Sequence, residues 1–256
     1  MKRIVFRLIF LLSLSIILSA CQPTTVSQQE AKQNIAQAQS EKVIIPIEDI
    51  PGAQASTARN FYFVFDGSGS MGDSPDGDCR GDQSFKRKIQ GAQWAAKELL
   101  KKIPKDVNIG LYVFDGGGQR EVISLGPNNH NLFLGEIDKL DANGGTPLAE
   151  GIRFATAKLV EQYKKQLGYG EYRLVVVTDG EADSIPEAAL NSTKYGIPIY
   201  AIGLCIGDNH PLKQYAFSYK AADSAEDLRQ SLEQTLAELP SFDIKEFKAV
   251  EPESVK

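Results

Sequence analysis

Five residues carry side-chain oxygens whose types and spacing could bind a metal ion. Asp66, Ser68 and Ser70 lie within the stretch FVFDGSGSMGD, directly after an apolar run. Asp179 follows the apolar stretch LVVVT, and Thr146 stands in NGGTPLAEG, just before a helical pattern. Two carboxylates and three hydroxyls are hard oxygen ligands, which suit Mg²⁺ or Mn²⁺ better than zinc. These three loops contain no His or Cys, which indicates the same preference.

Strand and helix patterns alternate between residues 58 and 240 and must position these loops. Four short runs are rich in β-branched or aromatic residues and are bounded by Gly, Pro or Asp, as strands are. They cover residues 61–65, 107–114, 172–178 and 197–204, and residues 120–126 suggest an antiparallel edge strand in a hairpin. Helical spacing covers residues 85–103, 146–163 and 224–239. This alternation predicts an α/β fold with a doubly wound, mostly parallel central sheet and helices on both faces.

In such a sheet, ligands lie beyond the carboxyl ends of the strands, so the three loops are expected to converge there. Their order and spacing resemble the von Willebrand factor A-type domain. The stretch DGSGS is similar to that family's Asp-x-Ser-x-Ser element, and GGTP and TDG are similar to its Thr and Asp elements. The likeness covers about residues 58–240.

This resemblance implies a complete metal-ion-dependent adhesion site without catalytic activity. It implies that Ser68, Ser70 and Thr146 coordinate Mg²⁺ through their hydroxyls, and that Asp66 and Asp179 act directly or through waters. Mn²⁺ and Ca²⁺ stay open as the ion. One coordination position would be left for an exposed Asp or Glu of a protein partner. No small-molecule substrate is expected.

Two other functions use the same residues. A metal-dependent hydrolase could employ Asp66 and Asp179 with a metal ion. For a hydrolase, the sequence offers no recognisable nucleophile and no Lys or Arg beside the loops, and we expect His130 and His210 to lie elsewhere. In a third interpretation, the ion merely stabilises a structural module of the cell envelope.

The N-terminus predicts export and lipidation. Three basic residues precede the apolar block LIFLLSLSIIL, which is too short for an ordinary membrane-spanning helix, and LSAC follows. These features resemble a bacterial lipoprotein signal, which implies cleavage after residue 20 and lipidation of Cys21, with palmitate among the acyl chains. Gln22 after the cysteine favours the outer membrane, if the host is Gram-negative. The expected location is the cell envelope.

Residues 21–57 are predicted to form the lipidated N-terminus and a flexible tether, with some helix near residues 30–40. A random coil of about 36 residues would place the domain about 30–35 Å from the membrane. Residues 241–256 are expected to form a C-terminal tail. The formal net charge of the 256 residues is −5, and removal of the three basic residues of the signal makes it −8. An acidic chain of this kind argues against nucleic acid as a partner.

Two cysteines remain after lipidation of Cys21. Cys79 stands in the acidic insertion DSPDGDCRGD, and Cys205 follows the strand-like run 197–204. Because compartments outside the cytoplasm permit disulfides, we expect these two residues to pair and to hold the insertion beside the metal loops.

Overall fold

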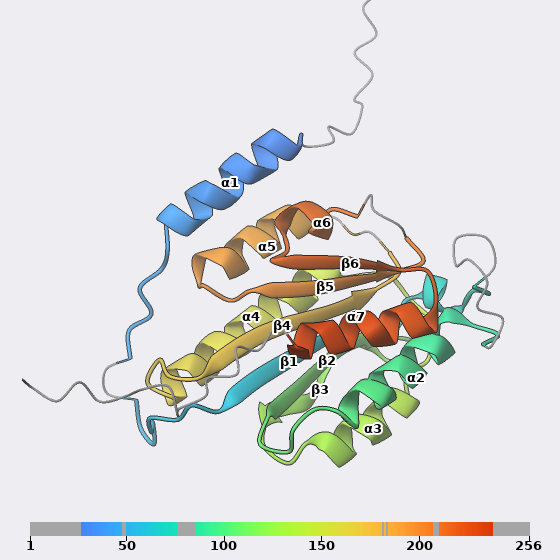
Figure 1. Ribbon diagram of the computed structural model, residues 1–256, viewed down its shortest axis with the longest axis horizontal. Coiled ribbons are helices and arrows are strands. Elements are labelled where there is room, and N and C mark those ends of the chain that lie inside the picture. The colour runs from blue at the N-terminus through green and yellow to red at the C-terminus, as the bar shows by residue number, and fades with distance from the viewer. Residues whose placement is uncertain are drawn as a thin grey trace, which may run out of the picture.

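The computed structural model describes residues 27–47, 50–75, 85–180, 182, 184–206 and 210–237. A six-stranded sheet with the order β3-β2-β1-β4-β5-β6 forms its centre (Figure 1). The strands are β1 (Arg59–Asp66), β2 (Asn108–Asp115), β3 (Gly118–Gly126), β4 (Glu171–Thr178), β5 (Ile199–Leu204) and β6 (Ser218–Ala222). The helices are α1 (Gln28–Ser40), the 3-10 turn η1 (Gly69–Gly72), α2 (Lys88–Leu100), α3 (His130–Asp138), α4 (Leu148–Lys165), α5 (Ile185–Lys194), α6 (Leu212–Tyr215) and α7 (Ala225–Ala237).

The predicted fold class is confirmed. Strand β1 pairs in parallel with β2 and β4, and β3 pairs antiparallel with β2 at one edge. All eight residues of β2 are buried, and so are seven of the eight in β1 and in β4. Strands covered on both faces need apolar residues at successive positions, which is why FYFVF and LVVV lack alternation.

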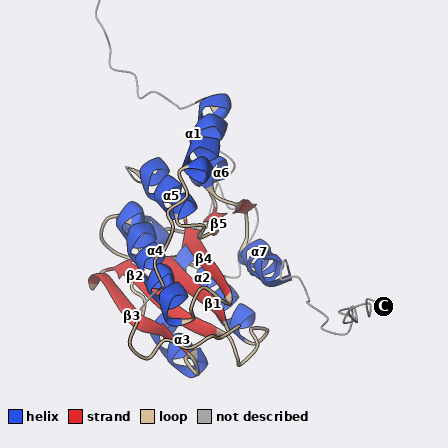
Figure 2. Ribbon diagram, turned by 90° about the vertical axis from the view of Figure 1, so that its left-hand side faces the viewer, coloured by secondary structure: helices blue, strands red, loops and turns tan. Residues whose placement is uncertain are grey.

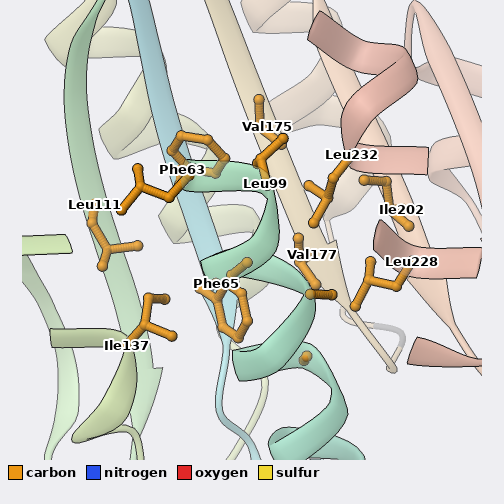
Figure 3. Packing of buried hydrophobic residues seen from close by; sticks show 14 of the residues in the cluster. Phe63, Phe65, Leu99, Leu111, Ile137, Val175, Val177, Ile202, Leu228 and Leu232 are labelled. Atoms are coloured by element: carbon orange, nitrogen blue, oxygen red, sulfur yellow. The ribbon is translucent and has the colours of Figure 1, made fainter. Parts of the chain in front are cut away.

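Alternate residues of the central strands contribute to two hydrophobic cores, one on each face of the sheet. Helices cover both faces (Figure 2). Figure 3 shows the first core, in which Phe63 and Phe65 of β1 lie with Val175 and Val177 of β4 and with Leu99 of α2. The other core contains residues of α4 and α5. The two layers hold the carboxyl ends of β1 and β4 in a fixed position.

Besides the 3-10 turn η1, four elements were not among those that the sequence predicts. Strand β6 extends the sheet beyond β5, yet four of its five residues are partly or fully exposed, so its hydrophobic pattern is weak. Helices α3, α5 and α6 are short, at nine, ten and four residues. Elements this short contain too few residues for a hydrophobic periodicity to be recognised in the sequence.

The N-terminal segment contains the helix that was expected near residues 30–40, but this helix is docked on the domain and is not part of a flexible tether. Helix α1 packs against α5 and α6, and Ala31 and Ala38 are buried in that contact. With Ile35 they form an i, i+4, i+7 stripe, which is the spacing of one helical face. Val43 N donates to Lys194 O at 2.9 Å and continues the contact beyond the helix. From residue 28 the segment is therefore part of the domain, because burying this stripe offsets the entropy lost on ordering it.

Replacing Ala31 with lysine is expected to detach α1 from α5. Ala31 is 1% exposed, and an ammonium at this position could reach water only by opening the contact. We expect a loss of about 1 kcal/mol, which lowers the midpoint of thermal unfolding by about 2–4 °C. Limited proteolysis should then cut α1 first. The matched control is Ala36→Lys on the exposed face of the same helix, and equal effects of the two substitutions would contradict the docking of α1.

Within the described residues, no helix is both long enough and apolar enough to cross a membrane. The predicted signal (1–20), Cys21 and the predicted tail (241–256) lie outside the described residues.

Candidate metal centre

The candidate site lies at the ends of two neighbouring strands, from which the chain continues toward opposite faces of the sheet. Asp66 ends β1, and Thr178 ends the adjacent strand β4. The chain leaves β1 toward α2 on one face of the sheet and leaves β4 toward α5 on the other. This divergence is the point at which open α/β sheets bind their ligands.

The loop after β1 is held against the loop that precedes α4. Gly69 N donates to Gly144 O at 3.0 Å, and Asn143 N donates to Gly67 O at 2.9 Å. Gly144 has a φ of 89°, a left-handed conformation that glycine adopts without strain. These backbone bonds bring Thr146 to the end of β1, although it lies 80 positions after Asp66 in the sequence.

Hydrogen bonds connect the predicted ligands in the loop after β1 with the one in the loop after β4. Ser68 N donates to Asp66 Oδ1 at 2.8 Å, and the hydroxyls of Ser68 and Ser70 lie 3.1 Å apart. Ser70 Oγ donates to Asp179 Oδ1 at 2.7 Å. A methyl group placed on Gly180 would lie 3.6 Å from Thr146 Oγ1 and 3.9 Å from Ser70 Oγ. The structure therefore brings all five sequence-predicted residues together at one end of the sheet.

Asp66 is a fully buried carboxylate with a second partner that sequence reasoning missed. Thr178 Oγ1 donates to Asp66 Oδ2 at 2.5 Å. Burial raises the pKa of Asp66 to about 6, although the hydrogen bonds from Ser68 and Thr178 favour the charged form. A cation beside this carboxylate would offset the cost of burying its charge.

Lys88 also belongs to the site, and this finding corrects the expectation that no Lys or Arg lies beside these loops. Its Nζ atom lies 3.0 Å from Asp179 Oδ2, and the two side chains are 13% and 0% exposed. Lys88 is the first residue of α2, the helix that follows the β1 loop. The amino end of a helix that follows a parallel strand lies at the carboxyl edge of the sheet, so topology could have revealed this neighbour.

His210 is a second neighbour of the site that was expected to lie elsewhere. Its Nδ1 accepts a hydrogen bond from Leu212 N at 3.1 Å, and its Nε2 lies 2.9 Å from Gly180 O. Nδ1 is thus an acceptor and Nε2 the donor, which fixes the tautomer. The His210 side chain therefore holds the loop after β4 by donating to the backbone carbonyl of Gly180. The other histidine, His130, begins α3 and is buried in a different part of the chain.

The donor set fits a hard divalent cation. No cluster of three or more His, Cys, Asp or Glu occurs among the residues that the structure describes. The site instead combines three hydroxyls with two carboxylates, and hydroxyl, carboxylate and water oxygens are the donors of Mg²⁺ and Mn²⁺ sites. Zinc sites use thiolate or imidazole ligands, which these loops do not supply.

The predicted disulfide stays a prediction, because Cys79 and most of its acidic insertion lie outside the described residues. Cys205 is buried directly after β5, and its N–H donates to Ala222 O at 2.8 Å. This position is at the same edge of the sheet as the candidate metal centre, as the sequence suggested.

Comparisons with known proteins agree with the architecture. An uncharacterized protein of Bacillus subtilis (strain 168), YwmD, is 26% identical over 205 residues, which span 71% of this chain and 86% of YwmD. An aerotolerance-related membrane protein of Bacteroides fragilis superposes with a TM-score of 0.54 at 15% identity, covering 69% of this chain and 98% of that one. The pilus adhesin SpaC of Lactobacillus rhamnosus GG gives 0.53 at 16% identity, over 73% of this chain but 31% of SpaC.

A structure described as von Willebrand factor type A from Catenulispora acidiphila gives a TM-score of 0.52 at 16% identity, over 73% of this chain and 47% of that one. At such low identities these structures establish a shared fold and no shared partner. The model of the von Willebrand factor type A domain family matches residues 60–248. The chain therefore belongs to the von Willebrand factor type A domain family.

Proposed function

We propose that this protein is a membrane-anchored binding module that engages an acidic residue of a protein partner through a divalent metal ion. One observation carries this proposal: three hydroxyls and two carboxylates from three separate loops meet at the end of β1. Domains of this family are often protein-interaction modules. The SpaC relative in fold is itself named a pilus adhesin.

In this proposal Ser68, Ser70 and Thr146 hold the ion through their hydroxyls, and Asp66 and Asp179 bind it directly or through waters. The ion supplies an electrophilic centre to which a carboxylate of the partner coordinates. Because three of the five donors are neutral hydroxyls, the ion keeps an attraction for that carboxylate. Mg²⁺ retains water ligands readily, so one of them can be exchanged for the partner.

We further propose that a lipid on Cys21 anchors the module to the cell envelope. One relative in fold is described as a membrane protein and another as a pilus adhesin, which fits a location at the cell surface. Helix α1 starts at Gln28, seven positions after Cys21, so seven Cα–Cα steps join them. Fully extended, they reach at most about 25 Å, so the docked helix would keep the domain close to the membrane.

A metal-dependent hydrolase is the second candidate, and Lys88 is the observation that favours it, because an ammonium beside a metal can hold a phosphate. However, this ammonium is already paired with Asp179. Release of phosphate from a phosphate monoester, dependent on Mn²⁺ and abolished by Asp66→Asn, would establish the hydrolase and contradict the binding module.

The proposed function is tested by retaining partners from envelope extracts on the immobilised chain. The soluble form begins at Gln22 and so keeps every described residue, including α1. A partner should be retained in Mg²⁺, released by EDTA, and absent from the Asp66→Asn variant. Its acidic residue is then located by Asp→Asn and Glu→Gln substitutions in the partner. Equal retention under all conditions would overturn the metal-bridged mechanism.

A further inference from the structure

Lys88 and Asp179 form an ion pair inside the candidate metal centre. The distance between Lys88 Nζ and Asp179 Oδ2 is 3.0 Å. The carboxylate is fully buried and the lysine side chain is 13% exposed, so solvent screens this pair far less than it screens a surface pair. Neither the family resemblance nor the donor set requires a lysine at this position.

The backbone around Lys88 fixes its position relative to the serine loop. Lys88 N donates to Asp73 O at 3.0 Å, and Asp73 N donates to Ser70 O at 3.1 Å. The side chain of Gln90 accepts from the N–H groups of Lys86 and Arg87 at 3.1 and 3.2 Å, which closes the start of α2. Lys88 is therefore attached to the same loop that carries Ser68 and Ser70.

Both oxygens of Asp179 already have a partner. Oδ1 accepts from the hydroxyl of Ser70 at 2.7 Å, and Oδ2 faces the ammonium of Lys88. A divalent ion that draws on Asp179, directly or through a water, competes with this ammonium for the charge of the carboxylate. The ammonium also repels the ion, because the two positive charges share one small site.

The charges of these groups indicate what Lys88 changes. Asp66 and Asp179 together carry two negative charges when ionised, and Lys88 reduces their sum to one. Binding of a divalent ion then leaves a net positive charge of one, whereas the same site without Lys88 would become neutral. The only other ion pair that we find next to these loops in the described structure, Arg120 with Asp115 at 2.6 Å, is neutral as a pair.

We propose that Lys88 is a tethered cation that lowers the affinity of the centre for its divalent ion and raises the attraction of the loaded centre for a carboxylate. This inference rests on the proposed function. It names the residue that sets how tightly the centre binds its ion and how strongly the loaded centre attracts a carboxylate. A centre that binds the ion weakly alone, and more strongly together with an acidic partner, couples occupancy by the metal to the presence of that partner.

The test is calorimetric titration of the soluble chain with MnCl₂ and with MgCl₂, without any partner. We expect Lys88→Met to bind Mn²⁺ about tenfold more tightly than the wild type, or better. Lys88→Arg keeps the charge and should keep the wild-type affinity. Lys86→Met removes an exposed lysine from the same loop and should leave the affinity unchanged within about twofold. Circular dichroism confirms that each variant is folded.

The outcomes separate this inference from the proposed function. Equal or weaker binding by Lys88→Met overturns the role of Lys88 and leaves a metal-bridged module standing. Binding by Lys88→Met but not by the wild type supports the competition, and the metal bridge is then overturned only if the wild type also retains no partner in Mg²⁺. If no form binds a divalent ion, both proposals are wrong.

Discussion

The Asp66→Asn variant is expected to lose at least about 100-fold in affinity for Mg²⁺ while keeping its fold. Asparagine has nearly the shape of aspartate and can still accept the hydrogen bond from Ser68 N. The hydroxyl of Thr178, which now donates to Asp66, can turn and accept from the amide instead. Loss of a neighbour of a metal ligand alone costs up to about 100-fold, so loss of a carboxylate ligand should cost at least as much. Calorimetric titration measures the affinity.

The stability of the metal-free protein gives an independent check. The pKa of Asp66 in the folded chain is raised to about 6 by burial, above its ordinary value. A raised pKa stabilises the fold at low pH, and this contribution is lost as the pH rises through about 6. At pH 7 without metal, the buried charge therefore costs stability, and Asp66→Asn removes that cost. We expect the metal-free variant to unfold at the same temperature as the metal-free wild type, or higher.

Asp106→Asn is the matched control for this substitution. Its carboxylate is 71% exposed, pairs with Arg59 and lies near the opposite end of β1. It should leave both the affinity for Mg²⁺ and the fold unchanged. If Asp66→Asn and the metal-free wild type are both unfolded, the ion is a structural one, and the binding proposal is replaced by that of a stabilised envelope module.

The fold was predictable because its central strands are buried on both faces. Apolar runs such as FYFVF predict such strands almost without reference to the rest of the chain. Strand β6 could not be found in this way, because its sequence SYKAA reflects an exposed edge whose pairing with β5 is made by backbone groups. The apolar stripe of helix α1, formed by Ala31, Ile35 and Ala38, is visible in the sequence, but it does not indicate which surface of the domain the helix covers.

The five oxygen-bearing residues were predictable because each stands in a short motif: four of them lie at or just after a strand end, and Thr146 lies just before helix α4. Lys88, Thr178 and His210 were not predictable from motifs, since each contributes through a contact that only the packed structure creates. Lys88 lies 91 positions before its partner Asp179 in the sequence. Local patterns therefore identified the candidate ligands, and tertiary packing supplied the groups that contact them or their loops.

The second prediction with a large effect concerns the glycine between Asp66 and Ser68. A Cβ atom on Gly67 would lie 2.7 Å from Cβ of Asp115 and 3.1 Å from the carbonyl oxygen of Phe114, both at the end of β2. Neither atom is the flexible end of a side chain, so the loop itself must move. We expect Gly67→Ala to lower the free energy of unfolding by about 1–3 kcal/mol. Urea denaturation at pH 7 measures this change.

Because the same loop carries the serine hydroxyls, Gly67→Ala should also weaken Mn²⁺ binding, by at least about tenfold, as Ser68 and Ser70 shift away from Asp179. Gly69 provides the control within the same motif. A Cβ atom there would meet Gly144 O at 3.5 Å, an ordinary contact, so Gly69→Ala should keep both stability and affinity. If both alanine variants behave like the wild type, the β1 loop does not depend on its close approach to β2. If both fail equally, lack of space at Gly67 is not the cause of the loss.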